Sequence, residues 1–443
     1  MADIARTARG RAARCAAADY RYRFPPSGRR IGNGLAVAEA ADHLLYVHRL
    51  QRTAVRAIAG ALIRIAPLEL KIELAHHLYQ HAEAAGTLRR RLADLRVSEK
   101  AMDDEFPAWL EIVANELLLV EDPVAFTLAL GESLVRTIGI HLHRYVRATD
   151  PLLDQPTVRI LRPILADLND MRTWFDAVER AAIEAGDNPR TWREPAARLL
   201  VQLEALPLGG DCVRSNARYE RPHACARDDR LATFHHTRQY RSDDLPGGVA
   251  PVDERAAQVL ELLRVQRDEL DAIETFANVI YDLRPPFDLE SLLARLVWDE
   301  ARHAEMGHQN LERLGHDPFA IPCGVIGINV RSPLPPLLAF AQISIFGELN
   351  QVGTLRRMAD RCYAAGDDAT GRAFDYTHAD EMMHLRAGRV WLQKLATEAG
   401  TDLDGLEHQA LEQAVRRLRE EDVIGEDYAN RITGADVTAL IGE

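Results

Sequence analysis

Lysine and cysteine are scarce in this sequence. Only three of its 54 basic residues are lysine, a bias that we attribute to GC-rich coding DNA and not to function. Its five cysteines are odd in number and lack dense, regular spacing, which argues against a disulfide framework and favours a reducing cytoplasmic setting. Because no apolar run looks long enough to cross a bilayer, we expect no membrane association.

Basic residues are also fewer than acidic residues, which gives a formal net charge of −13. A nucleic-acid binder would need a basic face for the phosphates, so we expect no nucleic-acid partner. The 443 residues are 47% hydrophobic and 27% charged, which suits a folded protein of two or three domains. Residues 1–30 are rich in arginine and lack the apolar core of a signal peptide. They read as a flexible tail, with a transit peptide as the alternative.

Strand signals are almost absent, and amphipathic helical periodicity dominates, so the sequence predicts an all-α fold. The predicted helices cover residues 36–65, 68–95, 104–119, 123–147, 157–184, 192–205, 252–283, 288–314, 334–364, 367–398 and 405–420. Breakers such as Arg284-Pro285-Pro286 and Gly366-Asp367-Asp368 fall where a helical bundle would turn.

A stretch rich in Gly, Arg, Asp and His interrupts this pattern near the middle of the chain and is interpreted as a linker. The predicted organisation is therefore a tail (1–30), a helical domain (31–206), a linker (207–250), a second helical domain (251–400) and a helical C-terminal tail (401–443). Each of the two domains is long enough for a four-helix bundle with its own core.

Two Glu-x-x-His pairs stand out in the C-terminal half, Glu300/His303 and Glu381/His384. Residues three apart share a helix face, so each pair can direct a carboxylate and an imidazole to one point in a helical core. A lone glutamate precedes each pair, Glu269 by 31 residues and Glu348 by 33. At a rise of about 1.5 Å per residue, that interval places the glutamate and the pair at the same height on two antiparallel helices joined by a turn. The repetition favours metal binding over surface ion pairs.

These residues resemble the ligand set of ferritin-like di-iron and di-manganese carboxylate proteins, in which two helices give one Glu each and two give Glu-x-x-His. The blocks Asp299-Glu300-Ala-Arg-His303 and Asp380-Glu381-Met-Met-His384 resemble those of a bacterial ferritin-like family of largely unassigned function. The resemblance implies that Glu300 and Glu381 bridge two metals, that His303 and His384 bind one each, and that Glu269 and Glu348 are terminal ligands. The third helix departs from that family, because Phe346-Gly347-Glu348 carries a glycine within the motif.

Two further residues compete for places in this site. Glu274 borders the same helical stripe as Glu269 and is an alternative first-helix ligand; we favour Glu269 because Glu269-Leu270 repeats as Glu348-Leu349. His378 lies one turn before Glu381 and is either an additional ligand or a histidine outside the metal shell.

Helical spacing also predicts a modest substrate pocket beside the metals, with close helix packing as the alternative meaning of its small residues. The predicted lining is Gln266, Ile273, Ala304, Gly307, Ser344, Gln351 and Thr377.

The N-terminal half looks like a degenerate, metal-free copy of the C-terminal half. His81-Ala-Glu aligns with His303-Ala-Glu, and Leu130-Gly-Glu-Ser133 with Phe346-Gly-Glu-Leu349. In this alignment Leu78, Leu168 and Met171 replace Glu300, Glu381 and His384. Because a buried carboxylate without a cation is costly, a bundle that holds no metal is expected to carry such replacements. The fold prediction is therefore two ferritin-like four-helix bundles in tandem, with chance similarity of helical sequences as the alternative.

The function expected from these patterns is a non-haem di-iron, or iron–manganese, oxidase or oxygenase. It would use O₂ and an external electron donor to oxidise a small organic substrate, plausibly in specialised metabolism. Alternatives are an iron-binding ferroxidase and a non-enzymatic helical scaffold with a structural metal. A homodimer is compatible with the sequence.

Overall fold

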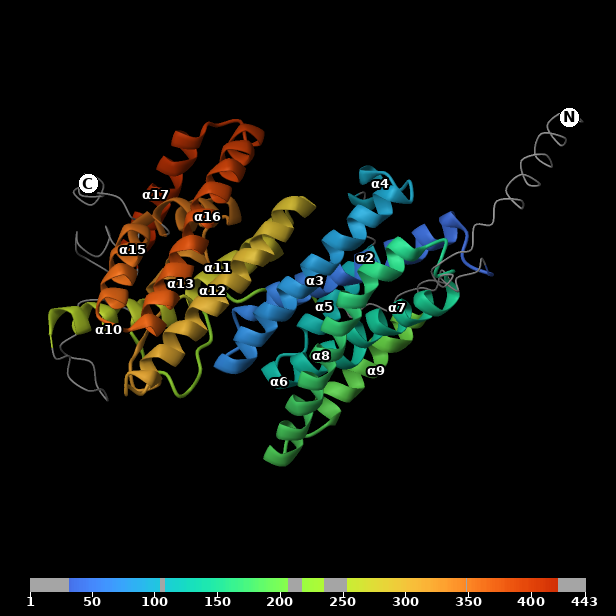
Figure 1. Ribbon diagram of the computed structural model, residues 1–443, viewed down its shortest axis with the longest axis horizontal. Coiled ribbons are helices and arrows are strands. Elements are labelled where there is room, and N and C mark those ends of the chain that lie inside the picture. Colours follow the sequence, from blue (N-terminus) through green and yellow to red (C-terminus); the bar gives the residue numbers. More distant parts are fainter. Residues whose placement is uncertain (1–31, 104–107, 206–216, 235–252, 348, 421–443) are drawn as a thin grey trace, which may run out of the picture.

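The computed structural model describes residues 32–103, 108–205, 217–234, 253–347 and 349–420 (Figure 1). The described chain is predominantly helical, which confirms the all-α prediction. Its two short strands, β1 (Thr233–Phe234) and β2 (Cys323–Gly324), form a parallel pair and were not predicted.

The helices of the N-terminal half follow the amphipathic periodicity of the sequence. In chain order they are α2 (Val37–Leu62), α3 (Leu68–Asp94), α4 (Glu99–Asp103), α5 (Ala108–Leu118), α6 (Pro123–Leu130), the π-helix η1 (Gly131–Val135), α7 (Arg136–Ala148), α8 (Gln155–Ala185) and α9 (Arg190–Ala205). The Asp122 side chain accepts a hydrogen bond from Ala125 N at 2.7 Å and caps α6, while Gly186 ends α8 with a φ of 91°. Such capping and left-handed residues fix where each helix begins and ends.

The C-terminal half has a similar series of helices. In chain order they are α10 (Glu254–Arg267), α11 (Leu270–Leu283), α12 (Phe287–Arg313), α13 (Ile326–Arg331), α14 (Pro336–Ala341), the π-helix η5 (Gln342–Gly347), α15 (Leu349–Ala364), α16 (Asp368–Glu398) and α17 (Leu403–Glu420). The short helix α13 was not predicted. The helix predicted over 252–283 is interrupted at Asp268 and Glu269, which separate α10 from α11.

Two helices of the N-terminal half have the same lengths as two helices of the C-terminal half. Helices α3 and α12 have 27 residues each, and α8 and α16 have 31 each. Between these members, each half has a helix that contains one π-helical stretch, η1 or η5. Isolated π-helical turns of this kind are uncommon and occur often at functional sites.

The segment α6–η1–α7 corrects one expectation from the sequence. Over Pro123–Ala148 it forms a continuous helix of 26 residues that is long and apolar enough to cross a membrane, by length and composition alone. The most apolar window of this helix is 61% buried within the protein, as in a core helix.

The two halves share one core. Helix α3 packs along α12 and α2 along α11. A continuous cluster of buried apolar side chains includes residues of all four helices. Helices α2 and α11 approach closely at Gly60, where an added Cβ would lie 2.7 Å from the Tyr281 ring. The described part of the predicted linker also contacts both halves, since Ala226 N donates to Ile63 O at 2.8 Å and Arg227 reaches Glu274 of α11.

Candidate metal centre

Five of the six ligands predicted from the sequence meet in the interior of the C-terminal half. Glu300 and His303 come from α12, Glu381 and His384 from α16, and Glu269 from the break before α11. Each of these residues is less than 9% exposed. The break between α10 and α11 gives Glu269 a backbone ψ of 4° and places it at the N-terminal end of α11. The sixth, Glu348, lies outside the described residues.

Three carboxylates surround the imidazole of His303. Its Nδ1 lies 3.0 Å from an oxygen of Glu269, 3.4 Å from one of Glu300 and 3.5 Å from one of Glu381. Ligand atoms of these four residues all lie within 4.8 Å of one another. This buried Glu/Glu/His/Glu group has the dimensions and the donor chemistry to hold a metal ion.

His384 faces the same two helical carboxylates from the other side. Its Nδ1 lies 3.2 Å from Glu300 Oε1 and 3.5 Å from Glu381 Oε2. The remaining oxygens, Glu300 Oε2 and Glu381 Oε1, are the ones directed at His303. Each of these two carboxylates therefore directs one oxygen toward each imidazole, and the two rings lie 6.2 Å apart.

Two atoms indicate that the residues fit a cation. Within the described chain, Glu300 Oε1 and His303 Nδ1 are buried and make no hydrogen bond, although both point into the cluster. A buried polar atom without a hydrogen bond costs free energy, so such groups ordinarily have a partner that satisfies them. A metal ion bound by the facing carboxylate and imidazole atoms would satisfy both.

The outward nitrogens of the two histidines are held by aspartates in a crossed arrangement. His303 Nε2 of α12 lies 3.3 Å from Asp380 of α16, and His384 Nε2 of α16 lies 3.4 Å from Asp299 of α12. Each aspartate immediately precedes the Glu-x-x-His pair of its own helix. A carboxylate on the outer nitrogen fixes the tautomer and orientation of a metal-binding imidazole. Both aspartates belong to the sequence motifs of the site, but no role was predicted for them.

Two arginines neutralise this aspartate pair. Arg302 lies between the two helices, where it contacts Asp299 and donates to Asp380 at 2.7 Å, while Arg295 donates to Asp299 at 2.7 Å. Burial opposes ionisation of Asp299, but His384 and the two arginines outweigh burial and lower its pKa to about 2. The aspartates are thus anions at neutral pH and accept hydrogen bonds from the imidazoles.

The histidines offset part of the negative charge within the cluster. Burial opposes ionisation of Glu300, yet its interactions with His303 and His384 lower the pKa of the carboxyl to about 2. Burial would also lower the pKa of His303, but Glu269 and Asp380 raise it well above the ordinary value. In the absence of a metal, the carboxylates therefore hold a proton on His303, and a metal ion would compete with that proton for the ring nitrogen.

Asp380→Ala is predicted to weaken metal binding about 10- to 100-fold, because the His303 ring loses the carboxylate that orients it. Asp380 suits this test better than Asp299, since its side chain is 15% exposed and that of Asp299 is 0% exposed. Competition with a chelator measures the affinity. Asp375→Ala, on an exposed face of the same helix, is the control, and equal affinities of the two variants would contradict the role given to Asp380.

The structure places Glu274 away from this cluster. Its side chain is fully buried against two cations, Lys71 of the N-terminal half and Arg227 of the connecting segment, the second at 2.5 Å. Of the two glutamates considered for the first-helix position, Glu269 is the one beside His303. His378 lies partly exposed on α16 and is not a member of the Glu269, Glu300, His303 and Glu381 group.

The residues predicted to line a substrate pocket have mixed surroundings. Gln266 donates to Thr377 Oγ1 at 2.7 Å, so these two polar groups partly satisfy each other. An added Cβ on Gly307 would lie 2.5 Å from Arg267 N, which shows that this glycine permits close approach of α12 to α10. Ile273, Ala304 and Ser344 are buried, and the Gln351 side chain lies outside the described residues. The pocket itself remains a prediction.

The N-terminal half has a different set of residues at the aligned positions. His81 Nδ1 pairs with the Gln51 side chain, and both groups are buried. Leu78, Leu168 and Met171 are also buried, among apolar neighbours. With an amide and hydrocarbons in place of carboxylates, this region lacks the anionic ligands that a hard or borderline metal ion requires.

His81→Ala is accordingly predicted to leave the metal content of the purified protein unchanged. Metal analysis of the folded variant, with folding checked by circular dichroism, tests this prediction. A large loss of metal would show that the N-terminal half contributes to metal binding.

No protein-family model, curated protein or solved structure matches this chain. The ferritin-like resemblance therefore depends on the motifs and on the geometry of the site.

Proposed function

We propose that the protein is a non-haem dinuclear-metal oxidoreductase of the ferritin-like class, which activates O₂ to oxidise a small organic substrate. The observation that carries this proposal is the position of Glu300 and Glu381, each of which directs one oxygen toward each of two buried imidazoles. Carboxylates so placed are suited to bridging two cations. A single cation would need fewer ligands than this cluster offers.

The proposed ligand set combines the residues of the cluster with one that the structure does not describe. Glu269 and His303 would hold one ion, His384 and Glu348 the other, and Glu300 and Glu381 both. Iron bound by such oxygen and nitrogen ligands can bind O₂ and oxidise a neighbouring substrate with electrons from an external donor, and manganese suits the same ligands.

The protein's own part in this chemistry is to fix the ligands and to exclude water. Asp299 and Asp380 hold the histidine rings from outside, and Arg302 links the two aspartates. The five described ligands are nearly inaccessible to solvent, so their charges act in a medium of low dielectric constant. Such a setting strengthens metal–ligand interactions and protects reactive species from side reactions.

We further propose that the two halves are tandem bundles of common origin. The equal lengths of α3 and α12, and of α8 and α16, support this, as do the π-helices η1 and η5. The pair Gln51–His81 is also the uncharged counterpart of Glu269–His303, since in both a side-chain oxygen meets a histidine Nδ1; Gln51 lies in α2, and Glu269 lies in the break between α10 and α11. On this proposal the N-terminal copy lost its metal and replaced its ligands with neutral groups.

Oxygen uptake by protein loaded with about two Fe(II) per chain, in the presence of excess chemical reductant, tests the oxidoreductase proposal. We expect continuous O₂ consumption that is abolished in the Glu300→Ala variant. Bound metal without O₂ consumption would indicate a structural metal and would reject the proposal. Uptake that continues only with added Fe(II), together with a large hollow assembly in light scattering, would instead indicate iron storage.

A further inference from the structure

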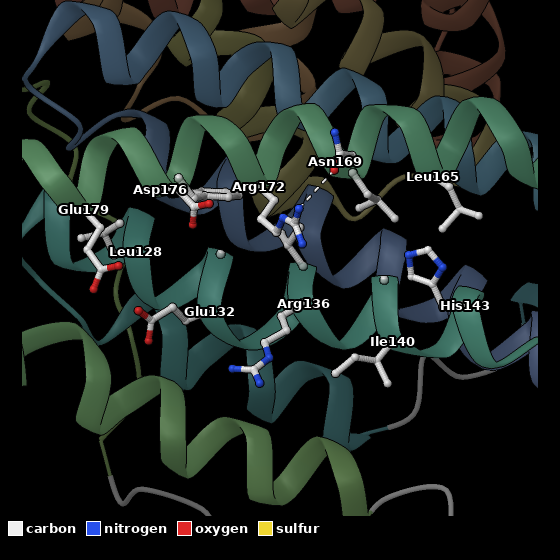
Figure 2. Close-up of a pocket in the computed structure, with 15 residues that line it drawn as sticks. Leu128, Glu132, Arg136, Ile140, His143, Leu165, Asn169, Arg172, Asp176 and Glu179 are labelled. Atoms are coloured by element: carbon white, nitrogen blue, oxygen red, sulfur yellow. Dashed lines mark hydrogen bonds between the residues drawn. The ribbon is translucent and has the colours of Figure 1, made fainter.

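A second candidate site lies in the N-terminal half, away from the proposed metal centre. A cavity of about 650 Å³ is lined by α6, η1 and α7 on one side and by α8 on the other (Figure 2). Its apolar wall includes Leu165, Leu168 and Phe175 of α8 and Ile140 of α7. Small-molecule sites have volumes of about 300 to 1,000 Å³, so this one has room for a small organic ligand.

Charged side chains are ordered along this cavity. Figure 2 shows the acids Glu132, Asp176 and Glu179 at one end, and Arg136 and Arg172 nearer the middle. Toward the opposite end lie the apolar Ile140 and Leu165, together with His143. The cavity thus presents an acidic, a basic and a mainly apolar region in succession.

The charged groups differ in how far the protein itself satisfies them. Glu179 accepts a hydrogen bond from Arg193 at 2.6 Å, whereas Arg172 is exposed and, among the described residues, makes one long contact of 3.3 Å with Asn169. Partial burial, followed by repulsion from Glu179, raises the pKa of Glu132 above its ordinary value. A cationic group beside Glu132 would relieve that destabilisation, and an anionic group would suit Arg172.

The backbone keeps the cavity open. Gly139 of α7 lines it, and a Cβ added there would meet no neighbouring side chain within 4 Å. At the acidic end, a Cβ on Gly131 would lie 2.7 Å from the Phe175 ring, so this glycine lets the ring form the floor. Glu132 belongs to the π-helix η1, whose wider turn alters the direction of successive side chains.

We propose that this cavity binds a small zwitterion of the amino-acid type with an apolar side chain. The ammonium group would lie beside Glu132 and Asp176, the carboxylate beside Arg172 and Arg136, and the side chain against Ile140 and Leu165. A ligand with both charges matches the order of the three regions, whereas a simple amine or a simple acid leaves one charged region unmatched. The site is independent of the proposed metal chemistry and gives the N-terminal half a binding role of its own.

Calorimetric titration of the full-length protein with L-phenylalanine, L-leucine, L-methionine and L-tryptophan tests the proposal. At least one is expected to bind, and phenylacetate and phenethylamine then serve as analogues of phenylalanine that lack one charge. Each analogue of a binding amino acid is expected to bind at least about tenfold more weakly than the zwitterion, since it leaves one charged region unmatched. No binding by any of the four amino acids, or equal binding by the single-charge analogues, overturns the proposal.

Variants of the cavity sharpen the test. Gly139→Leu fills the open space and is expected to abolish binding, whereas Gly139→Ala, which removes the same helix-destabilising glycine, retains it. Arg172→Met is expected to weaken amino-acid binding at least about tenfold while leaving the amine analogue unaffected. Glu132→Gln is expected to weaken amino-acid binding while leaving the binding of the acid analogue, phenylacetate, unaffected. Equal binding by the Leu and Ala variants overturns the proposal, and the metal content of every variant shows separately whether the proposed metal centre is intact.

Discussion

The double variant Glu300→Ala, His384→Ala is expected to lose about two metal ions per chain together, where the wild-type protein would bind about two. Glu300 faces both imidazoles, so its removal takes a ligand from both proposed metal positions. Loss of His384 removes the nitrogen ligand of one of them. Metal analysis of the purified proteins by mass spectrometry measures the result.

A second Glu-x-x-His pair on the same helix provides a matched control. Glu305 and His308 follow the same spacing on α12, but Glu305 accepts a hydrogen bond from Gln309 and His308 lies 3.6 Å from Glu312. Glu305→Ala, His308→Ala is expected to retain the full metal content. An unchanged metal content in the Glu300, His384 variant would defeat the proposed metal centre and the oxygen chemistry that depends on it.

Glu274→Gln is expected to lower the free energy of unfolding by about 3 to 5 kcal/mol, the usual cost of breaking a buried ion pair. The substitution keeps the shape of the side chain but leaves Lys71 and Arg227 without a carboxylate, although their side chains are only 1% and 4% exposed. Urea denaturation measures the change in stability. The metal content of the folded variant is expected to equal that of the wild-type protein.

Two comparisons test this interpretation of Glu274. Asp375→Asn breaks an exposed pair with Arg356 and is expected to cost less than about 1 kcal/mol. Adding Lys71→Met to Glu274→Gln removes one of the two cations that have lost their carboxylate. The double variant is therefore expected to be more stable than the sum of the two single effects implies. Loss of metal by Glu274→Gln without loss of stability would make Glu274 a ligand after all.

Much of the helical architecture could be predicted from the sequence because its causes are local. Apolar residues recur with the helical period, and residues such as Asp122 and Gly186 mark where helices begin and end. The spacing of Glu300 with His303, and of Glu381 with His384, likewise follows from the three-residue repeat of one helix face. The structure brings these four residues together, as that spacing leads one to expect.

The features missed by sequence reasoning depend on contacts between distant segments. Lys71 and Glu274 are 203 positions apart, and neither residue has a local signature that reveals its partner. The sequence therefore left Glu274 open as a ligand. The crossed contacts of Asp299 and Asp380 depend on how α12 and α16 are aligned, although an aspartate immediately before each Glu-x-x-His pair was a signal that could have been used.

The apolar periodicity of the sequence also could not reveal the interruptions within helices. The break at Asp268 and Glu269 keeps helical character on both sides, so the periodicity of residues 252–283 continues across it. The π-helices η1 and η5 have a wider turn than the α-helix, and they lie within stretches whose apolar periodicity predicts ordinary helix. Such irregularities are decided by packing against neighbouring helices.

The buried charges between the halves have a consequence for how the chain can change. Glu290 of α12 is neutralised by Arg52 of α2 at 2.8 Å, just as Glu274 of α11 is neutralised by Lys71 of α3. If the two halves were separated, each would expose a wide apolar face that carries charged side chains without their counterions. The amino-terminal helices therefore support the C-terminal half without contributing a ligand to its candidate metal site, because they supply counterions and the apolar surface against which that half packs.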